Sequence, residues 1–195
     1  FRSIIFEDLP RTGIPELFSS YKDYQSYVKT LIQSNTIDEP TKIWWDIRPH
    51  SIYPTLEFRI CDCCTSMMDA LSIAALIQAL VAKLIILRNS NQSWRNYRGS
   101  LIHENKWRAT KNGIEANLVD LGKSKEVSYK KLICEMLEFI DEVVDDLESR
   151  KYIDHIETIL EDGSSADKQL EVFKNTNNIK DVVDHLITET AKDTV

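Results

Sequence analysis

The 195-residue chain is 43% hydrophobic and 28% charged, which is enough apolar material for a buried core and too much for a disordered chain. Its formal net charge of -7 argues against a general nucleic-acid-binding protein, because such proteins need an excess of Lys and Arg to displace counterions from phosphates. We therefore expect one domain over residues 1–195 and no nucleic-acid partner.

The first forty residues predict an irregular opening followed by one helix. Proline and glycine interrupt residues 10–15, so no regular element is expected there. Ser20 stands three residues before Asp23, which is typical of a helix N-cap. Apolar side chains then recur at helical spacing, at Tyr24, Val28 and Leu31. The helix should end before Pro40.

Two short runs, Ile43 to Arg48 and Thr55 to Asp62, predict an antiparallel hairpin around a proline-containing turn. Side chains alternate between the two faces of a strand, so the apolar residues of both runs can face a core together. In that arrangement four charged side chains project from the opposite face: Asp46, Arg48, Glu57 and Arg59. Two carboxylates and two guanidinium groups would then stand close together.

A long helix is predicted from Thr65 or Ser66 to about Arg88. It is apolar almost all round, so we expect it to be buried at the centre of the domain. Polar side chains at Ser72, Gln78 and Lys83 interrupt the apolar run and argue against a membrane span.

The rest of the chain predicts more helices and one further hairpin. A helix over residues 94–112 should end at Gly113, and short strands near 116–120 and 126–128 could flank a turn at Gly122. From Tyr129 onward the chain reads as helical, with later helices near 151–161, 166–175 and 179–190. The helix that begins at Tyr129 carries an apolar stripe: Ile133, Leu137, Ile140, Val144 and Leu147. The predicted class is α+β, a small antiparallel sheet packed with multiple helices and an all-helical C-terminal region.

The four cysteines, Cys61, Cys63, Cys64 and Cys134, match no disulfide framework of a small secreted domain. A zinc site would need a second Cys or His pair at suitable spacing. We expect small apolar fillers in a reducing cytoplasm.

The segment from Trp44 to His50, followed by Pro54 to Asp62, is similar to the signature region of bacterial and archaeal carboxylate-amine ligases. Shorter matches follow the same order along the chain, at residues 10–15, 104–109, 163–169 and 183–186. The whole therefore resembles the C-terminal half of an ATP-dependent carboxylate-amine ligase of the glutamate-cysteine ligase type 2 family.

This resemblance implies a glutamine synthetase-like fold, in which ATP and Mg2+ lie across a curved antiparallel sheet. It implies activation of glutamate as an acyl phosphate, attack by the amine of cysteine or another amine, and a cytoplasmic role in glutathione biosynthesis. Glu57 would be the metal ligand. Arg48 and Arg59 would be catalytic residues that face the transferring phosphate or the substrate carboxylate.

These residue types suit that chemistry. Phosphoryl transfer depends on positioning and charge neutralisation, and the planar fork of Arg matches phosphate oxygens in pairs. Further candidates for nucleotide binding are Arg11, in a Gly/Pro loop, and Lys106 and Arg108, which lie two apart on a helix and so do not share a face. His50 could contact nucleotide or stabilise its own turn.

One difference from the family pattern shapes the expectations. Full members begin with a Glu-rich strand that supplies further metal ligands, and no equivalent precedes Phe1. We therefore expect an incomplete site and an unpaired sheet edge that favours a homo-oligomer. The alternatives are a non-catalytic fragment or interaction module and, with less support, a guanidino kinase of the same superfold.

Overall fold

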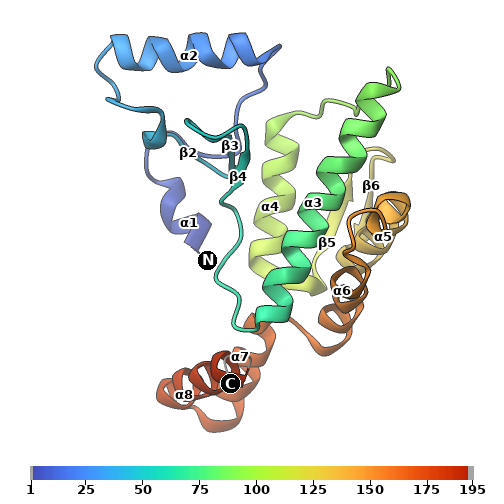
Figure 1. The fold of residues 1–195 in the computed structure, drawn as a ribbon. Coiled ribbons are helices and arrows are strands. Elements are labelled where there is room, and N and C mark those ends of the chain that lie inside the picture. The colour runs from blue at the N-terminus through green and yellow to red at the C-terminus, as the bar shows by residue number, and fades with distance from the viewer. Residues whose placement is uncertain (1, 193–195) are drawn as a thin grey trace. The chain divides into compact units, whose positions relative to one another are not determined.

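A computed structural model describes residues 2–192 of the chain (Figure 1). The chain divides into two compact units, an N-terminal unit, Phe1–Asp62, and a C-terminal unit, Cys63–Val195. Helices predominate, and the strands of the described residues form small two-stranded sheets. The predicted α+β class is confirmed.

The N-terminal unit combines two helices with four very short strands. In chain order these are α1 (Arg2–Glu7), β1 (Thr12–Gly13), α2 (Tyr21–Gln33), a 3-10 turn (Pro40–Lys42), β2 (Trp44–Trp45), β3 (Ile47–Pro49) and β4 (Leu56–Phe58). The sequence did not predict α1. It also did not predict the parallel pairing of β1 with β2, in which Thr12 lies opposite Trp44.

Helix α2 forms as predicted and carries the core of this unit. The Ser20 hydroxyl accepts a hydrogen bond from the Asp23 backbone N–H at 3.2 Å, so the N-cap is present. Tyr24 and Val28 from the helix are buried together with three residues that follow it: Ile37, Ile43 and Trp45.

The predicted hairpin exists, but its strands are shorter than expected. Strands β3 and β4 pair antiparallel, with Arg48 directly opposite Glu57. The apolar face of the first run is buried at Ile43 and Trp45. The expectation that the second run also buries its apolar face is wrong at its ends, since Leu56 is 49% exposed and Ile60 is 44% exposed.

The C-terminal unit is mainly helical. It contains α3 (Met67–Asn89), α4 (Gly99–Asn112), a 3-10 turn (Gly113–Glu115), β5 (Asn117–Asp120), β6 (Lys125–Ser128), α5 (Tyr129–Val144), α6 (Arg150–Asp162), α7 (Ser165–Thr176) and α8 (Ile179–Lys192). The expected second hairpin is confirmed, because β5 and β6 pair antiparallel. Helix α4 begins at Gly99, five residues later than predicted.

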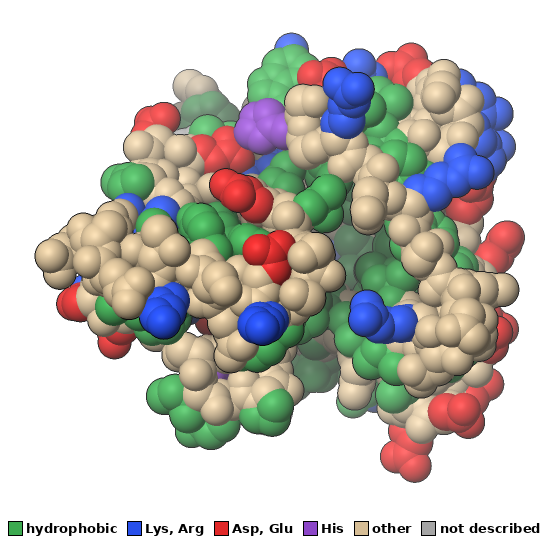
Figure 2. Space-filling model, turned by 90° about the horizontal axis from the view of Figure 1, so that it is seen from above, with side chains coloured by type: hydrophobic (Ala, Val, Ile, Leu, Met, Phe, Trp, Pro, Cys, Tyr) green, Lys and Arg blue, Asp and Glu red, His purple; other side chains and the backbone are tan. Residues whose placement is uncertain are grey.

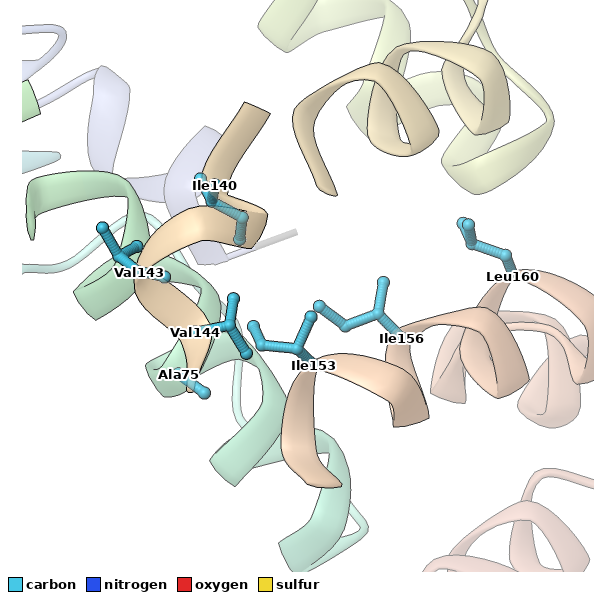
Figure 3. Close-up of a cluster of buried hydrophobic side chains, with 8 residues drawn as sticks. Ala75, Ile140, Val143, Val144, Ile153, Ile156 and Leu160 are labelled. Carbon is cyan, nitrogen blue, oxygen red and sulfur yellow. The ribbon is translucent and has the colours of Figure 1, made fainter. Parts of the chain in front are cut away.

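The core of this unit lies between α3, α5 and α6 (Figure 3). Ile140, Val143 and Val144 come from α5, and Ile153, Ile156 and Leu160 come from α6, with Ala75 and Ala79 on α3. The apolar stripe predicted on α5 is therefore confirmed as intradomain packing. Burial of such side chains stabilises the unit by roughly 1.5–3 kcal/mol for each large one.

Helix α3 is less buried than the sequence suggested. Only small side chains on it are buried among the described residues, namely Ser72, Ala75 and Ala79. Apolar side chains such as Ile85 (54% exposed) and Ile86 (43% exposed) face outward, and hydrophobic groups are visible at the surface of the molecule (Figure 2). Helix α3 is long and apolar enough to cross a membrane, since one 18-residue stretch of it has a mean hydropathy of 2.3. A single helix of this kind is weak evidence for a membrane span, and 17% of the stretch is buried.

Candidate functional site

The hairpin of β3 and β4 brings Arg48, Glu57 and Arg59 into direct contact. The Nε and Nη2 atoms of Arg48 both lie 2.8 Å from Oε2 of Glu57. Nη1 of Arg59 donates to the other carboxylate oxygen, Oε1, at 2.6 Å. We call these three side chains the Arg-Glu-Arg cluster. They meet as the predicted strand alternation required.

Strand geometry explains why these three residues meet. Arg48 and Glu57 are cross-strand partners, so their side chains leave the sheet on the same face. Arg59 is two residues beyond Glu57 and points the same way. Its backbone N–H donates to the carbonyl of Asp46 at 2.7 Å, which continues the pairing past the last strand residue. The hairpin backbone thereby fixes the spacing of the cluster.

Arg48 is the most enclosed member of the cluster, with its side chain 11% exposed. Its Nη1 donates to the backbone carbonyl of Thr41 at 2.7 Å and also to that of Ile43. All three nitrogens of the guanidinium group are therefore engaged within the unit. This arrangement makes Arg48 a positioning residue that ties the hairpin to the preceding 3-10 turn.

Arg59 is differently placed. Its side chain is 26% exposed, and Nη1 is the guanidinium nitrogen that bonds to Glu57. Within residues 2–192, the structure shows no hydrogen bond from the remaining donors of Arg59 to another side chain or carbonyl, so they can reach an anionic ligand. Arg59 is thus better placed than Arg48 to meet a phosphate or a carboxylate.

Glu57 is held as a carboxylate. Partial burial acts to raise its pKa, but the hydrogen bonds and charges of Arg59 and Arg48 outweigh that effect, so the pKa lies below its ordinary value of 4.5. An ionised carboxylate is a suitable magnesium ligand. Both oxygens already accept from arginine, however, and the two guanidinium charges oppose a cation at the same place.

The donor set of the described chain does not by itself form a metal site. Nowhere in residues 2–192 do three His, Cys, Asp or Glu side chains gather closely enough to hold an ion. Mg2+ keeps several waters and needs only one or two carboxylates when phosphate supplies other oxygens. Glu57 would act as one ligand of a phosphate-bound ion only after it releases an arginine contact, so its role as a metal ligand stays a prediction.

The space beside the cluster is small. A hollow of about 10 Å3 borders Arg48, Glu57 and Thr41, which is room for about one water molecule. It adjoins a larger hollow of about 320 Å3 against helix α2. Three residues line both hollows: Pro40, His50 and Ser51.

Arg11 also belongs to the N-terminal unit. Its backbone adopts a positive φ of 62°, which is uncommon for a residue other than glycine, and its carbonyl accepts from the Trp44 N–H at 2.8 Å. Its Nε donates to the carbonyl of Lys42 at 3.3 Å. The residue thereby holds the loop that precedes the hairpin against β2.

Lys106 and Arg108 lie on α4 in the C-terminal unit. Arg108 bonds to Glu104 at 2.7 Å and to Glu126 at 3.0 Å, and the hydrogen bond to Glu104 is the main cause of its raised pKa. The neighbouring Asn105 donates to the carbonyl of Val119 at 2.8 Å and accepts from its N–H at 2.7 Å. The hydrogen bonds of Asn105 connect α4 to β5, a role that the sequence did not indicate.

The Gly163–Gln169 motif has a structural role at the start of α7. Ser164 and Asp167 form a reciprocal capping box. The Ser165 hydroxyl lies 2.6 Å from that of Thr65, which precedes α3, and also accepts from Gln169 at 3.2 Å. The motif therefore connects two segments that are a hundred residues apart in sequence.

His155 has a carboxylate partner from a distant part of the chain. Its Nε2 lies 2.9 Å from Oδ1 of Asp69, which is in the first turn of α3. No local signal could have shown this pair, because 86 residues separate its members. The cysteines are free thiols, and burial raises the pKa of Cys61, which keeps that thiol protonated at neutral pH.

Comparison with known proteins identifies the family. The family model described as Glutamate-cysteine ligase family 2 (GCS2) matches residues 1–185. The chain belongs to glutamate-cysteine ligase family 2. The suspected relationship is thereby confirmed over nearly the whole chain, and the Arg-Glu-Arg cluster lies inside the matched region.

Curated relatives in this family carry the name "Putative glutamate--cysteine ligase 2". Those from Chloroflexus aggregans and Roseiflexus castenholzii are each 48% identical over 97% of this chain, which corresponds to 49% and 50% of their own lengths. That from Solibacter usitatus is also 48% identical, over 97% of this chain and 49% of its own length. The chain spans about half the length of the curated relatives it matches.

Proposed function

We propose that this member of glutamate-cysteine ligase family 2 contributes a nucleotide- and substrate-binding part of an ATP-dependent carboxylate-amine ligase. The observation that carries the proposal is the Arg-Glu-Arg cluster, which pairs an enclosed arginine with an accessible one around an ionised carboxylate. Family membership and the names of the relatives support the reaction class.

The proposed reaction forms a γ-glutamyl amide in two steps. The side-chain carboxylate of glutamate attacks the γ-phosphorus of ATP, the bond to ADP breaks, and an acyl phosphate results. The amine of the acceptor then attacks the acyl carbon, loses a proton and releases inorganic phosphate. Cysteine is the acceptor we expect, although another amine would undergo the same chemistry.

The cluster can assist the first step by charge. Negative charge accumulates on the phosphate oxygens during transfer, and a positioned guanidinium group stabilises it. Arg59 has the free donors for this contact, whereas Arg48 orients Glu57 and the hairpin. Mg2+, when bound with the nucleotide, would neutralise phosphate charge, and Glu57 would supply one oxygen ligand to it.

Isothermal titration with ATP and Mg2+ tests this proposal on the chain itself. We expect weak binding that Arg59→Ala or Glu57→Gln abolishes. The exposed Arg95→Ala is a matched control, because it removes an arginine outside the cluster and should leave binding unchanged. Binding that is indifferent to both cluster substitutions, or no binding at all, would contradict the assignment of the site to this cluster.

The second candidate is a non-catalytic folding or interaction module. Two observations favour it: the chain spans about half the length of the relatives it matches, and the cluster contains a single carboxylate. Release of phosphate from ATP with glutamate, with and without cysteine, separates the two functions. Nucleotide binding without any release in this chain would favour the module, and release that depends on a different amine would overturn cysteine as the acceptor.

A further inference from the structure

A hollow of about 600 Å3 in the C-terminal unit is large enough for a small molecule, since ligand pockets span roughly 300–1,000 Å3. It lies against helices α3 and α5, and it is bounded by the segment before α4 and by the turn between β5 and β6. Its lining residues all belong to the C-terminal unit, whereas the Arg-Glu-Arg cluster belongs to the N-terminal unit. The hollow therefore offers a site that the proposed function does not use.

The two helices give the hollow an apolar wall. Leu80 and Leu84 lie one helical turn apart on α3. On α5, Leu132, Met136 and Phe139 recur at helical spacing, so they share one face of that helix. Leu80 and Phe139 also pack against the buried core of the unit, which holds this wall in place. The apolar body of a ligand would be removed from water here.

Aromatic rings border the hollow from the segment that precedes α4. Trp94 and Tyr97 come from this segment, and Trp94 is 57% exposed. The Trp94 ring packs edge-to-face on Phe139, with the ring centroids 5.1 Å apart. The ammonium nitrogen of Lys83 lies 5.1 Å from the centroid of the same Phe139 ring, and Glu142, at 2.7 Å, balances its charge. The aromatic part of the lining therefore already stabilises a cation.

The polar end of the hollow carries more negative than positive charge. Lys123 Nζ lies 2.7 Å from Oε2 of Glu135 and 3.3 Å from Oδ2 of Asp120, and all three residues line the hollow. The hydrogen bond from the Lys123 backbone is the main cause of the lowered pKa of Asp120. The hydrogen bond to Glu135 is the main cause of the raised pKa of Lys123. Among the described residues of the lining, two carboxylates thus face one ammonium group.

Acceptors for a second ammonium group are present at this end. Within residues 2–192, the structure shows no hydrogen bond to Oε1 of Glu135, because Lys123 donates to Oε2. The Tyr97 hydroxyl lies near the same end, since a Cβ added at Gly122 would lie 3.5 Å from it and 3.3 Å from Oδ1 of Asp120. An ammonium group has three donors to offer such acceptors. An anionic group would instead meet both carboxylates, with Lys123 already paired.

We propose that this hollow binds an organic cation, namely a primary amine with an apolar or aromatic body. The body would lie against α3 and α5 beside Trp94, and the ammonium group would pair with Glu135. Charge and apolar lining together select this class of ligand, because neither an anion nor a strongly polar molecule matches both ends of the hollow.

Isothermal titration of the chain compares three ligands that carry a phenyl ring on the same four-carbon chain: phenylbutylamine, phenylbutanol and phenylbutanoate. At neutral pH these are a cation, a neutral molecule and an anion. We expect the amine to bind most tightly and the acid least tightly. Glu135→Gln should weaken amine binding roughly fivefold, the upper end for a partly exposed ion pair, and should leave binding of the alcohol unchanged. Glu138→Gln is the matched control, because this exposed carboxylate lies on the same helix but outside the lining.

A substitution that fills the hollow tests its apolar part. Leu84→Trp adds a larger ring at a position that is 37% exposed, so circular dichroism should show a folded chain while all three ligands bind more weakly. Unchanged binding by Leu84→Trp, or no binding of any of the three ligands to the unaltered chain, would overturn the site. Equal affinities for the three ligands, or amine binding that Glu135→Gln leaves unchanged, would overturn the assignment of a cation.

Discussion

Arg48→Ala is expected to destabilise the N-terminal unit by about 3 kcal/mol, although the residue belongs to a cluster that the proposed function uses for binding. The side chain is 11% exposed and contacts three groups: the Glu57 carboxylate and the carbonyls of Thr41 and Ile43. Truncation to alanine removes the donors and leaves all three acceptors in place.

The magnitude follows from those contacts. An enclosed carbonyl that loses its donor costs at least about 1 kcal/mol, and two carbonyls are affected here. Loss of the ion pair to Glu57 adds about 1 kcal/mol, less than for a fully buried pair, because Arg59 and water still reach the 32% exposed carboxylate. Arg59→Ala, by contrast, removes one contact of a more exposed side chain and should cost below about 1 kcal/mol.

Urea unfolding followed by tryptophan fluorescence measures this difference. Trp45 is a suitable reporter because it is 4% exposed and lies in the core of the same unit. Arg48→Lys provides a further comparison, since it keeps the charge but not the planar fork, and should fall between the two alanine variants. If Arg48→Ala proves no less stable than Arg59→Ala, the view of Arg48 as the positioning residue is refuted.

Four more outcomes follow from the structure. Because the pKa of Glu57 is lowered in the folded state, its ionised carboxylate stabilises the fold at pH values above 4.5, and this stabilisation is lost as the pH falls through the folded-state pKa. Between about pH 6 and about pH 3 the unaltered chain should therefore lose more stability in urea than Glu57→Gln. Equal losses would contradict the ion pairs. Gly163→Ala should lower stability by at least about 1 kcal/mol in thermal unfolding, because the residue has φ +90° and a new Cβ would lie 3.1 Å from Asp167 Cβ. Gly99→Ala, which meets nothing within 4 Å, is its control and should not destabilise. Asn105→Ala should cost about 1–2 kcal/mol through two lost hydrogen bonds to β5, and hydrogen exchange at that strand should rise. Light scattering should show self-association of the chain, through sheet edges and exposed apolar surface, and a monodisperse monomer would oppose it.

The two arginines of the cluster have different surroundings. Arg48 is enclosed and fully bonded, so it sets the position of Glu57, whereas Arg59 retains donors for a ligand. The resemblance placed both arginines at the phosphate, and residue type alone could not separate them. Their difference depends on which backbone carbonyls lie nearby.

Local signals in the sequence determined much of this protein. The N-caps at Ser20 and Ser66, the glycine at position 113 and the apolar stripe on α5 predicted helices that the structure contains. Strand alternation predicted that Arg48, Glu57 and Arg59 share a face. These predictions succeed because capping, backbone conformation and side-chain periodicity depend on residues only a few positions apart.

Tertiary structure alone decided the remaining features. The parallel pairing of β1 with β2, the His155–Asp69 contact and the Thr65–Ser165 contact join residues from distant parts of the chain. The burial of α3 was overestimated, because an apolar helix shows from its sequence how much surface it could bury but not how much its neighbours cover. Such contacts depend on how elements pack, and packing energy is shared by side chains that no local pattern links.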